Sequence, residues 1–422
     1  MSCQMAPSNF SKCLQDATAV ASLAFAVALS HEFAMQFTNL PPLSRADIDR
    51  FTVLALTTAT DLIHQTDVED GPIRWTLDGQ DADFKIYKGE EPMATKSSTS
   101  GLYCGIMNIQ GTLEEVIDLF RTDTTEMAKE YCQRVGKGLV DAVNLYTLAT
   151  PSSDSPTRIS LKWILAKSAL DGVVRKRDGC VLECDHLFYL PDGRRGWVRS
   201  FKSVPLACCP NFEASLGYIR VNQRGTGHVF IESDRPGYVQ AAYLHNCDTG
   251  GHLVEWLASA GIKKRCENLV DIDRFLRENR LSRGRWLSSI DLLPLTSRKN
   301  CFHCQKQFGL LRKPSNCRQC GQVVCGNCNV LWNVKIYNQW TRARACVLCS
   351  VRPCSTRTSK EISVGSRRTV DSGVWHVTPS DEGSFCVVSP TNTYAGGASS
   401  PHIGQLKRQN STLVDFGDVL RY

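Results

Sequence analysis

The 422-residue sequence lacks an apolar run long enough to cross a bilayer as a helix. An Ala-rich run at residues 17–30 has only 14 residues, whereas a membrane span needs about 20. No clear cleavage site follows it before His31 and Glu32. We therefore expect the N-terminal segment, residues 1–36, to form an amphipathic helix, and a signal peptide is the alternative.

The sequence also lacks the short motifs of the common enzyme classes. It has no G-x-S-x-G elbow, no P-loop and no kinase motif set. Residues 184–186 place a thiol, a carboxylate and an imidazole in a row, but neighbouring side chains of a strand point to opposite faces. Residues 245–248 with His252 could hold a metal, although a strand-to-helix loop capped at Asp248 or Thr249 is the simpler interpretation. We expect a protein that is not an enzyme.

Acidic residues are missing from one stretch, residues 298–352, which contains ten Lys or Arg. The whole chain has a net charge of +7, so this stretch carries more than the entire excess. A basic segment of this kind fits an anionic membrane, a protein partner or nucleic acid. Trp332, Tyr337 and Trp340 could stack on bases, but aromatics in so small a module more often cover its core. We favour the membrane, then a protein, over nucleic acid.

Cysteine, in contrast, is abundant, with 20 residues. Twelve of them are scattered, which indicates reduced thiols of the cytosol. The other eight form four C-x2-C pairs: Cys301 and Cys304, Cys317 and Cys320, Cys325 and Cys328, Cys346 and Cys349. Such pairs favour metal over a disulfide framework, and four thiolates close one tetrahedral structural Zn2+ site. Eight cysteines therefore predict two zinc ions, whose binding would supply the folding free energy of a small module.

The spacing also predicts how the pairs combine. Only four residues separate the second pair from the third, which suits an interleaved arrangement. We expect Cys301, Cys304, Cys325 and Cys328 to bind one zinc ion. The other zinc ion then takes Cys317, Cys320, Cys346 and Cys349.

This segment, residues 295–352, resembles a FYVE-type zinc finger. The resemblance rests on the spacing and on three strings: residues 308–313, the C-R-x-C-G string at 317–321, and R-A-C at 344–346. It implies that Leu310 and Leu311 enter the bilayer. It also implies that Lys313, Arg318 and Arg344 bind the head group of phosphatidylinositol 3-phosphate on an endosomal membrane.

The sequence departs from the FYVE pattern at several positions. Ser315 and Asn316 stand where the family has two histidines, Pro314 replaces a basic residue, and Leu292 stands where a W-x-x-D motif begins. Histidines gain charge on acidification and then bind phosphate better. Because Ser315 and Asn316 cannot titrate, we expect finger binding to change little between about pH 5.5 and 7.5.

Residues 40–282 have the pattern of an α+β domain. A capping start at Ser44 predicts a helix to about residue 63, and Thr112-x-x-Glu115 is a capping box before a short helix. A second short helix is expected at 125–135, and a long C-terminal helix at 253–281. We expect strands at residues 73–77, 84–87, 102–109, 143–148, 159–165, 181–190, 196–205, 216–224, 227–232 and 238–245.

Two local patterns sharpen this expectation. Apolar residues at 159–165 alternate with Arg158, Ser160 and Lys162, which predicts an antiparallel strand with one solvated face. Asp178-Gly179 is a turn signal.

The order of elements resembles the START lipid-binding fold. The resemblance rests on this order and on the neighbouring finger, an arrangement typical of large protist families, especially those of oomycetes. It implies a helix-grip domain, in which a curved antiparallel sheet surrounds a C-terminal helix and encloses a cavity for one apolar lipid. The leading hypothesis is a non-enzymatic, cytoplasmic, peripheral-membrane protein that binds lipid.

Two other hypotheses stay open. One is a zinc-dependent adaptor that binds a protein partner and whose sheet domain has a filled core. The other is an E3-like zinc cross-brace, which the missing central histidine disfavours. Residues 353–422 are rich in Ser, Thr, Gly and Pro, so we expect a disordered tail.

Overall fold

A computed structural model describes residues 37, 39–90, 100–153, 155–168, 174–251 and 254–352. The expectations for residues 1–36 and for the tail at 353–422 lie outside this range. Among the described residues, no helix is long and apolar enough to cross a membrane.

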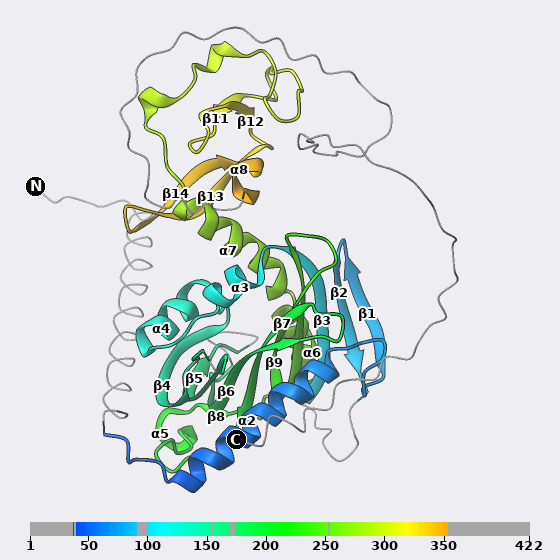
Figure 1. The fold of residues 1–422 in the computed structure, drawn as a ribbon, viewed down its shortest axis with the longest axis vertical. Coiled ribbons are helices and arrows are strands. Elements are labelled where there is room, and N and C mark those ends of the chain that lie inside the picture. The colour runs from blue at the N-terminus through cyan, green and yellow to red at the C-terminus, as the bar shows by residue number, and fades with distance from the viewer. Residues whose placement is uncertain are drawn as a thin grey trace, which may run out of the picture. The chain divides into compact units, whose positions relative to one another are not determined.

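The larger domain is built on one curved antiparallel sheet (Figure 1). The strands follow the order β1-β2-β3-β10-β9-β7-β6-β5-β4, and the short β8 pairs in parallel with β6. Their bounds are β1 Trp75–Asp81, β2 Phe84–Gly89, β3 Ser100–Gln110, β4 Leu139–Ala149, β5 Thr157–Ala166, β6 Arg177–Tyr189, β7 Arg195–Ser203, β8 Ile219–Arg220, β9 Asn222–Glu232 and β10 Tyr238–Asp248. The predicted α+β class is confirmed.

Helices cover both faces of this sheet. On one face, α2 (Arg45–Gln65) starts where Ser44 accepts a hydrogen bond from the Asp47 backbone, and it buries Phe51 and Leu62. The other face meets α3 (Leu113–Leu119), which has the predicted capping box, and α4 (Thr125–Arg134). The C-terminal helices α6 (Glu255–Cys266) and α7 (Asn268–Arg283) pack there too, against β3 and β10.

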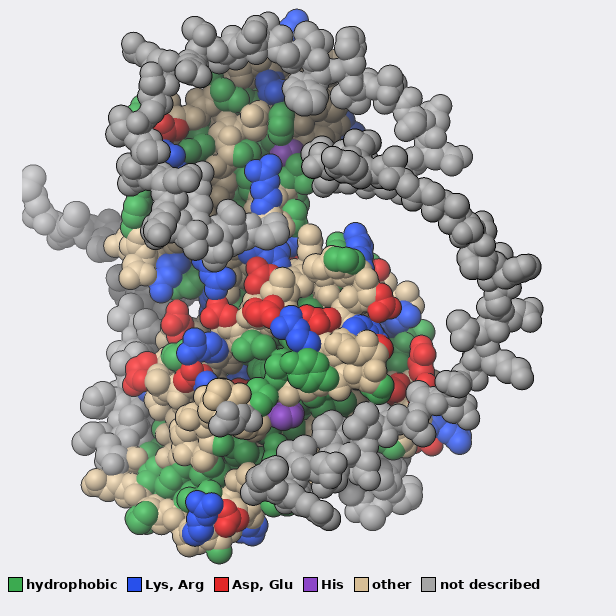
Figure 2. All heavy atoms as spheres, in the orientation of Figure 1, with side chains coloured by type: hydrophobic (Ala, Val, Ile, Leu, Met, Phe, Trp, Pro, Cys, Tyr) green, Lys and Arg blue, Asp and Glu red, His purple; other side chains and the backbone are tan. Residues whose placement is uncertain are grey.

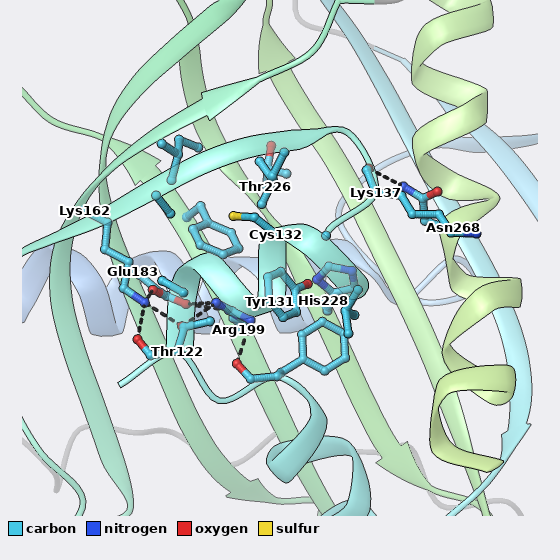
Figure 3. Close-up of a pocket in the computed structure, with 18 of the residues that line it drawn as sticks. Thr122, Tyr131, Cys132, Lys137, Lys162, Glu183, Arg199, Thr226, His228 and Asn268 are labelled. Carbon is cyan, nitrogen blue, oxygen red and sulfur yellow. Dashed lines mark hydrogen bonds and ion pairs between the residues drawn. The ribbon is translucent and has the colours of Figure 1, made fainter. Parts of the chain in front are cut away.

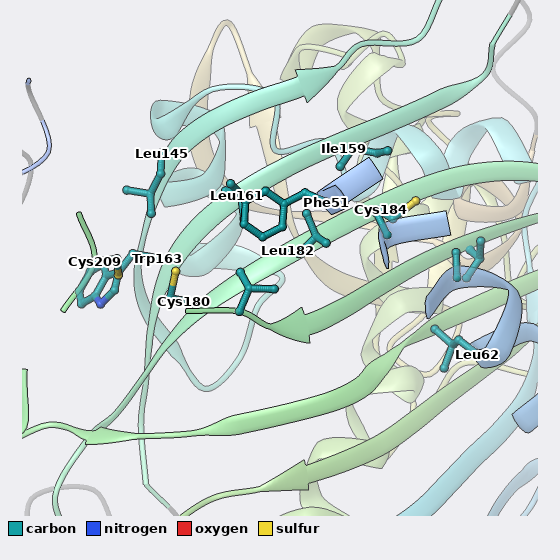
Figure 4. Packing of buried hydrophobic residues seen from close by; sticks show 14 of the residues in the cluster. Phe51, Leu62, Leu145, Ile159, Leu161, Trp163, Cys180, Leu182, Cys184 and Cys209 are labelled. Carbon is teal, nitrogen blue, oxygen red and sulfur yellow. The ribbon is translucent and has the colours of Figure 1, made fainter. Parts of the chain in front are cut away.

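The two faces differ in character because strand side chains alternate. Leu161, Trp163 and Leu165 of β5 lie in the apolar cluster beneath α2 (Figure 4). Lys162 points to the opposite face and is only 3% exposed. The expectation of a solvated face on this strand is therefore wrong, because α4 packs over that side of the sheet and covers it.

Four local expectations also need correction. Residues 216–224 do not form one strand: α5 (Glu213–Leu216) ends at Gly217, which has the left-handed φ of 71°, before β8 and β9 begin. Asp178-Gly179 is no turn but the start of β6, where the buried Asp178 carboxylate accepts from Trp163 Nε1 at 3.0 Å.

The other two corrections concern the C-terminal region. Strand β10 continues to Asp248, so His245 lies in the sheet, and Val254 rather than Asp248 or Thr249 caps α6. The expected single C-terminal helix is broken at Glu267, where the Val270 N–H bonds to the Glu267 carbonyl in a tighter turn. Cys266 and Leu269, on either side of this turn, both lie in the same buried cluster.

The finger follows α7 and consists of two small hairpins. It has two 3-10 turns, η2 (Ser289–Asp291) and η3 (Leu295–Ser297), followed by strands β11 (Pro314–Asn316), β12 (Val323–Cys325), β13 (Asn329–Ile336) and β14 (Gln339–Cys346), and by α8 (Val347–Val351). Its buried cluster includes Trp332 and Val334 together with Leu281 of α7.

Candidate functional site: a two-metal finger and an internal cavity

The eight cysteines meet in two groups of four. One group is Cys301, Cys304, Cys325 and Cys328, and the other is Cys317, Cys320, Cys346 and Cys349. Within each group the sulfur atoms all lie within 4.8 Å of one another. This is the interleaved grouping that the spacing suggests.

The sulfur geometry fits zinc. Four sulfurs about 2.3 Å from a tetrahedral zinc ion lie about 3.8 Å apart. The Cys304 and Cys325 sulfurs are 3.7 Å apart, and those of Cys317 and Cys349 are 3.9 Å apart. These separations are far too long for a disulfide bond. Each group is therefore able to hold a structural Zn2+ ion with no open coordination position.

Backbone amides help to position the ligand sulfurs. The Cys325 N–H donates to Cys301 Sγ at 3.3 Å, and the Cys346 N–H donates to Cys317 Sγ at 3.1 Å. Such bonds favour the thiolate form that zinc requires.

A two-residue turn presents the apolar tip of the finger. Gly309 and Arg312 exchange both backbone hydrogen bonds at 3.1 Å, so that Leu310 and Leu311 form the turn between them. Leu310 is 96% exposed and Leu311 is fully exposed. Burying a leucine side chain is worth about 1.5–3 kcal/mol, so two exposed neighbours are an unused source of binding energy.

The three basic residues assigned to the head group have no carboxylate neighbour. Lys313 follows the leucine turn directly, and backbone pairing of the Arg318 N–H with the Arg344 carbonyl at 3.1 Å places these two arginines side by side. Within the described part of the chain, no Asp or Glu lies in ion-pair distance of Lys313, Arg318 or Arg344. Acidic side chains gather instead over the sheet domain, on the face drawn in Figure 2.

The residues at the two histidine positions bond inside the finger. Ser315 Oγ donates to the Val324 carbonyl at 3.2 Å and accepts from Asn329. Asn316 donates to the Leu293 carbonyl at 2.7 Å and the Gly321 carbonyl at 3.2 Å. Both side chains thus stabilise the turn around the second cysteine group.

Helix α7 ties the finger to the sheet domain. Arg274, Glu278 and Ser282 lie one above another on this helix and bond to every second residue on the free edge of β13: the Leu331 carbonyl, the Asn333 N–H and the Lys335 N–H. Four helical residues rise about 6.0 Å and two strand residues about 6.7 Å, so the two rows stay nearly in step. The spacing of polar residues on α7 is the one feature of the sequence that points to this junction.

The sheet domain contains a cavity between the sheet and helices α4, α6 and α7. Its inner part, about 150 Å³, is lined by Phe120, Tyr131, Val135, Phe201 and Ile272 among others (Figure 3). A larger part of about 480 Å³ shares lining residues with it. Sizes of this order fit one small ligand.

A buried ionic cluster forms one wall of the inner part. Glu183 accepts from both Lys162 and Arg199, and Thr122 Oγ1 accepts from Lys162 at 2.6 Å and from Arg199 at 2.9 Å (Figure 3). Burial alone would raise the pKa of Glu183, but Arg199 and Lys162 lower it to about 2. Next to it, burial and then Glu183 raise the pKa of Asp185 to about 7.

Sequence reasoning missed this cluster. Lys162 and Glu183 each alternate with buried apolar neighbours on β5 and β6, which also fits a solvated strand face. One further feature of the sequence points to the cluster: Lys162 on β5 and Glu183 on β6 carry opposite charges on consecutive strands.

The chain thus combines an α+β sheet domain with a two-site zinc finger. Residues 293–360 match the family model of the FYVE zinc finger. The chain is 32% identical over 69 residues to 1-phosphatidylinositol 3-phosphate 5-kinase FAB1 of Saccharomyces cerevisiae, and 33% identical over 57 residues to zinc finger FYVE domain-containing protein 9 of Homo sapiens. These alignments span 16% and 14% of this chain but only 3% and 4% of the two relatives.

Solved structures similar to the chain include lipid-transfer proteins. Human StAR-related lipid transfer protein 5 superposes with a TM-score of 0.42 at 13% identity, over 54% of this chain and 96% of that one. Human STARD10 superposes with a TM-score of 0.34 at 14% identity, over 56% and 82%.

Proposed function

We propose that this chain is a non-enzymatic, cytoplasmic, peripheral-membrane protein whose finger docks on phosphoinositide-containing or other anionic membrane. Its sheet domain holds an apolar lipid in the internal cavity. The observation that carries the proposal is the leucine turn, Leu310 and Leu311, fully exposed beside Lys313.

The docking mechanism combines two weak contributions. The two leucines leave water for the acyl region, while Lys313, Arg318 and Arg344 meet phosphate oxygens, each basic residue contributing about 1 kcal/mol near an anionic surface. Phosphatidylinositol 3-phosphate on endosomes is the specific target that these residues suggest.

Helix α7 supports the idea that both domains act at one surface. Its Ile272 and Asn268 line the cavity, and its Leu281 lies in the buried cluster of the finger. A finger docked on a membrane would therefore hold the cavity at a fixed distance from the same membrane.

The test is co-sedimentation of the zinc-loaded full chain with liposomes. Vesicles would be neutral, or contain phosphatidylserine, or phosphatidylinositol 3-phosphate at matched charge. We expect the doubly substituted Leu310→Ala, Leu311→Ala chain to bind at least about tenfold more weakly, and Arg318→Ala to lose any preference for the phosphoinositide. Leu77→Ala, a half-exposed leucine of β1, is the matched control and should bind normally.

The outcomes separate the hypotheses. Binding that follows charge alone would leave a non-selective membrane anchor. Absence of binding to every vesicle would contradict the proposal and favour the adaptor hypothesis, in which the finger binds a protein. Mass spectrometry of gently purified chain tests the cavity separately, because a filled core would carry no stoichiometric lipid.

A further inference from the structure

Two arginines line the larger part of the cavity without a carboxylate partner. Arg265 belongs to α6 and Arg177 begins β6, and both border the 480 Å³ space. In the part of the chain that the structure describes, the Arg265 side chain makes no hydrogen bond or ion pair. Among the described residues, Arg177 bonds only to the Ser168 hydroxyl and to backbone carbonyls, the closest being that of Arg175.

Two other basic residues that border the same space are paired with carboxylates. Lys137 Nζ lies 2.7 Å from the Asp271 carboxylate, and Lys264 Nζ lies 2.7 Å from that of Glu267. Arg265 directly follows Lys264 in the sequence, so the difference does not come from a lack of acidic residues nearby. It comes from the direction in which each side chain leaves the helix.

The positive charge of Arg265 lowers the pKa of two other residues that line the cavity. Burial and then Arg265 lower the pKa of Arg177, and the same two causes lower the pKa of His245 to about 3. The two carboxylates that line this space, Asp178 and Asp271, are each paired with another cation, Arg220 and Lys137. Two guanidinium groups that repel each other across the shared space therefore leave a site of positive potential. A bound anion would relieve this repulsion.

Neutral polar groups face the same space unpaired. His245 of β10 is 3% exposed, and neither of its ring nitrogens has a hydrogen-bond partner among the residues that the structure describes. The buried Gln223 Oε1 of β9 is also unpaired. An unpaired buried polar group lowers the stability of the folded chain, and a ligand head group or ordered water would remove that cost.

The surroundings also offer room for a hydrocarbon chain. The larger space shares Leu139, Ile164 and Tyr243 with the inner part, whose walls add Phe120, Val135 and Phe201. The cationic end thus adjoins a part of the cavity with apolar walls on one side and the self-paired cluster of Lys162, Glu183 and Arg199 on the other.

We infer that the cavity binds a single-chain amphiphile with an anionic head group, which Arg265 and Arg177 hold by charge and His245 holds by a hydrogen bond. The head is a carboxylate or a phosphate monoester, and the chain extends toward Phe120 and Phe201. This inference rests on the proposed lipid-binding function of the sheet domain and specifies its ligand.

The experiment measures binding of matched amphiphiles to the delipidated, zinc-loaded full chain by isothermal titration calorimetry at pH 8. The probes share one oleoyl chain and differ in their heads: oleic acid, oleoyl lysophosphatidic acid, oleyl alcohol and monoolein. Each is used below its critical micelle concentration. The variants are Arg265→Gln and Lys263→Gln, a lysine of the same helix that pairs with Asp78 and does not line the cavity. Zinc content and thermal unfolding show that each variant is folded.

We expect the natural chain to bind at least one anionic probe about tenfold or more tightly than the neutral probes. Arg265→Gln should lose this preference yet keep its affinity for oleyl alcohol, while Lys263→Gln should keep the preference. The probe that shows the Arg265-dependent gain identifies the head as carboxylate or phosphate.

Two results would overturn the inference in different ways. Equal binding of charged and neutral probes, or a preference that survives in Arg265→Gln, would leave a lipid-binding cavity without an anion site. Absence of binding by all four probes would remove the lipid-binding function of the sheet domain as well.

Discussion

The finger and the sheet domain place their charges in opposite ways. In the finger, Lys313, Arg318 and Arg344 remain at the surface, and the interior is made of thiols and a few apolar side chains. In the sheet domain, Lys162, Glu183 and Arg199 are each at most 3% exposed.

The difference follows from how each part is held together. A module as small as the finger cannot bury enough apolar surface to compensate for ionic groups, so metal ligation organises it and its charges stay available to a partner. The sheet domain has two large apolar clusters, which can compensate for the desolvation of an ionic group. Its buried charged residues, Lys162, Glu183 and Arg199, therefore line an internal cavity and are not available at the surface.

Removal of zinc should have the largest effect, and it should unfold the finger but not the sheet domain. Structural zinc contributes an apparent ~10–16 kcal/mol in small fingers, so a chelator should unfold the finger while the sheet persists on its own clusters. Hydrogen exchange would show loss of protection in β11 to β14 and in the last turn of α7, because Leu281 packs in the finger.

Matched cysteine variants serve as controls for chelation. Cys317→Ser should reproduce the effect of the chelator on the second cysteine group, whereas Cys208→Ser, outside both groups, should not. Simultaneous loss of protection in β5 and β6 would show that finger and sheet unfold as one unit.

Glu183→Gln should give the next largest effect. It keeps the shape of the side chain but leaves Lys162 and Arg199 buried without their carboxylate, and breaking such a group costs about 3–5 kcal/mol. Chemical denaturation measures the loss. The control is Glu114→Gln, an exposed partner of Arg195, for which we expect under about 1 kcal/mol.

The pH dependence of Glu183 adds a second check. Its pKa of about 2 in the folded chain is below the ordinary value, so its stabilising contribution is present at neutral pH and is lost as pH falls from about 4.5 toward 2. The Glu183→Gln variant should lack this part of the acid sensitivity.

A smaller effect is expected from His245. Burial and Arg265 lower its pKa to about 3, so the unfolded chain takes up the proton first, and the contribution of His245 is lost as pH falls below about 6.5. Relative to His245→Gln, the natural chain should lose about 1–2 kcal/mol more of its unfolding free energy between pH 6.5 and 5. Parallel denaturation curves at several pH values measure this difference, and identical slopes would contradict it.

The contrast between the two parts also explains what the sequence could predict. Zinc ligands need fixed residue types at fixed spacing, so the two cysteine groups follow from Cys301 to Cys349 alone. Strand periodicity places most of β1 to β10. The cavity depends on which face of β5 is covered by a helix. The alternation of apolar and polar residues along β5 is the same whether Lys162 faces water or α4, so it could not predict the cavity. His245 has no spacing signal, because Arg265 and Arg177, which line the same space, come from distant elements.

The smallest effect concerns the finger and acidification. Ser315 and Asn316 make fixed hydrogen bonds to Val324, Leu293 and Gly321, and neither can gain a proton. Binding of the full chain to phosphoinositide vesicles should therefore change less than about twofold between pH 7.5 and 5.5, where an ordinary histidine would become charged. An Asn316→His variant should bind more tightly at pH 5.5 than at 7.5 if the position faces the head group. A steep pH dependence in the natural chain would mean that another group titrates at the membrane surface, and the separation between a pH-insensitive finger and an acid-sensitive sheet domain would no longer hold.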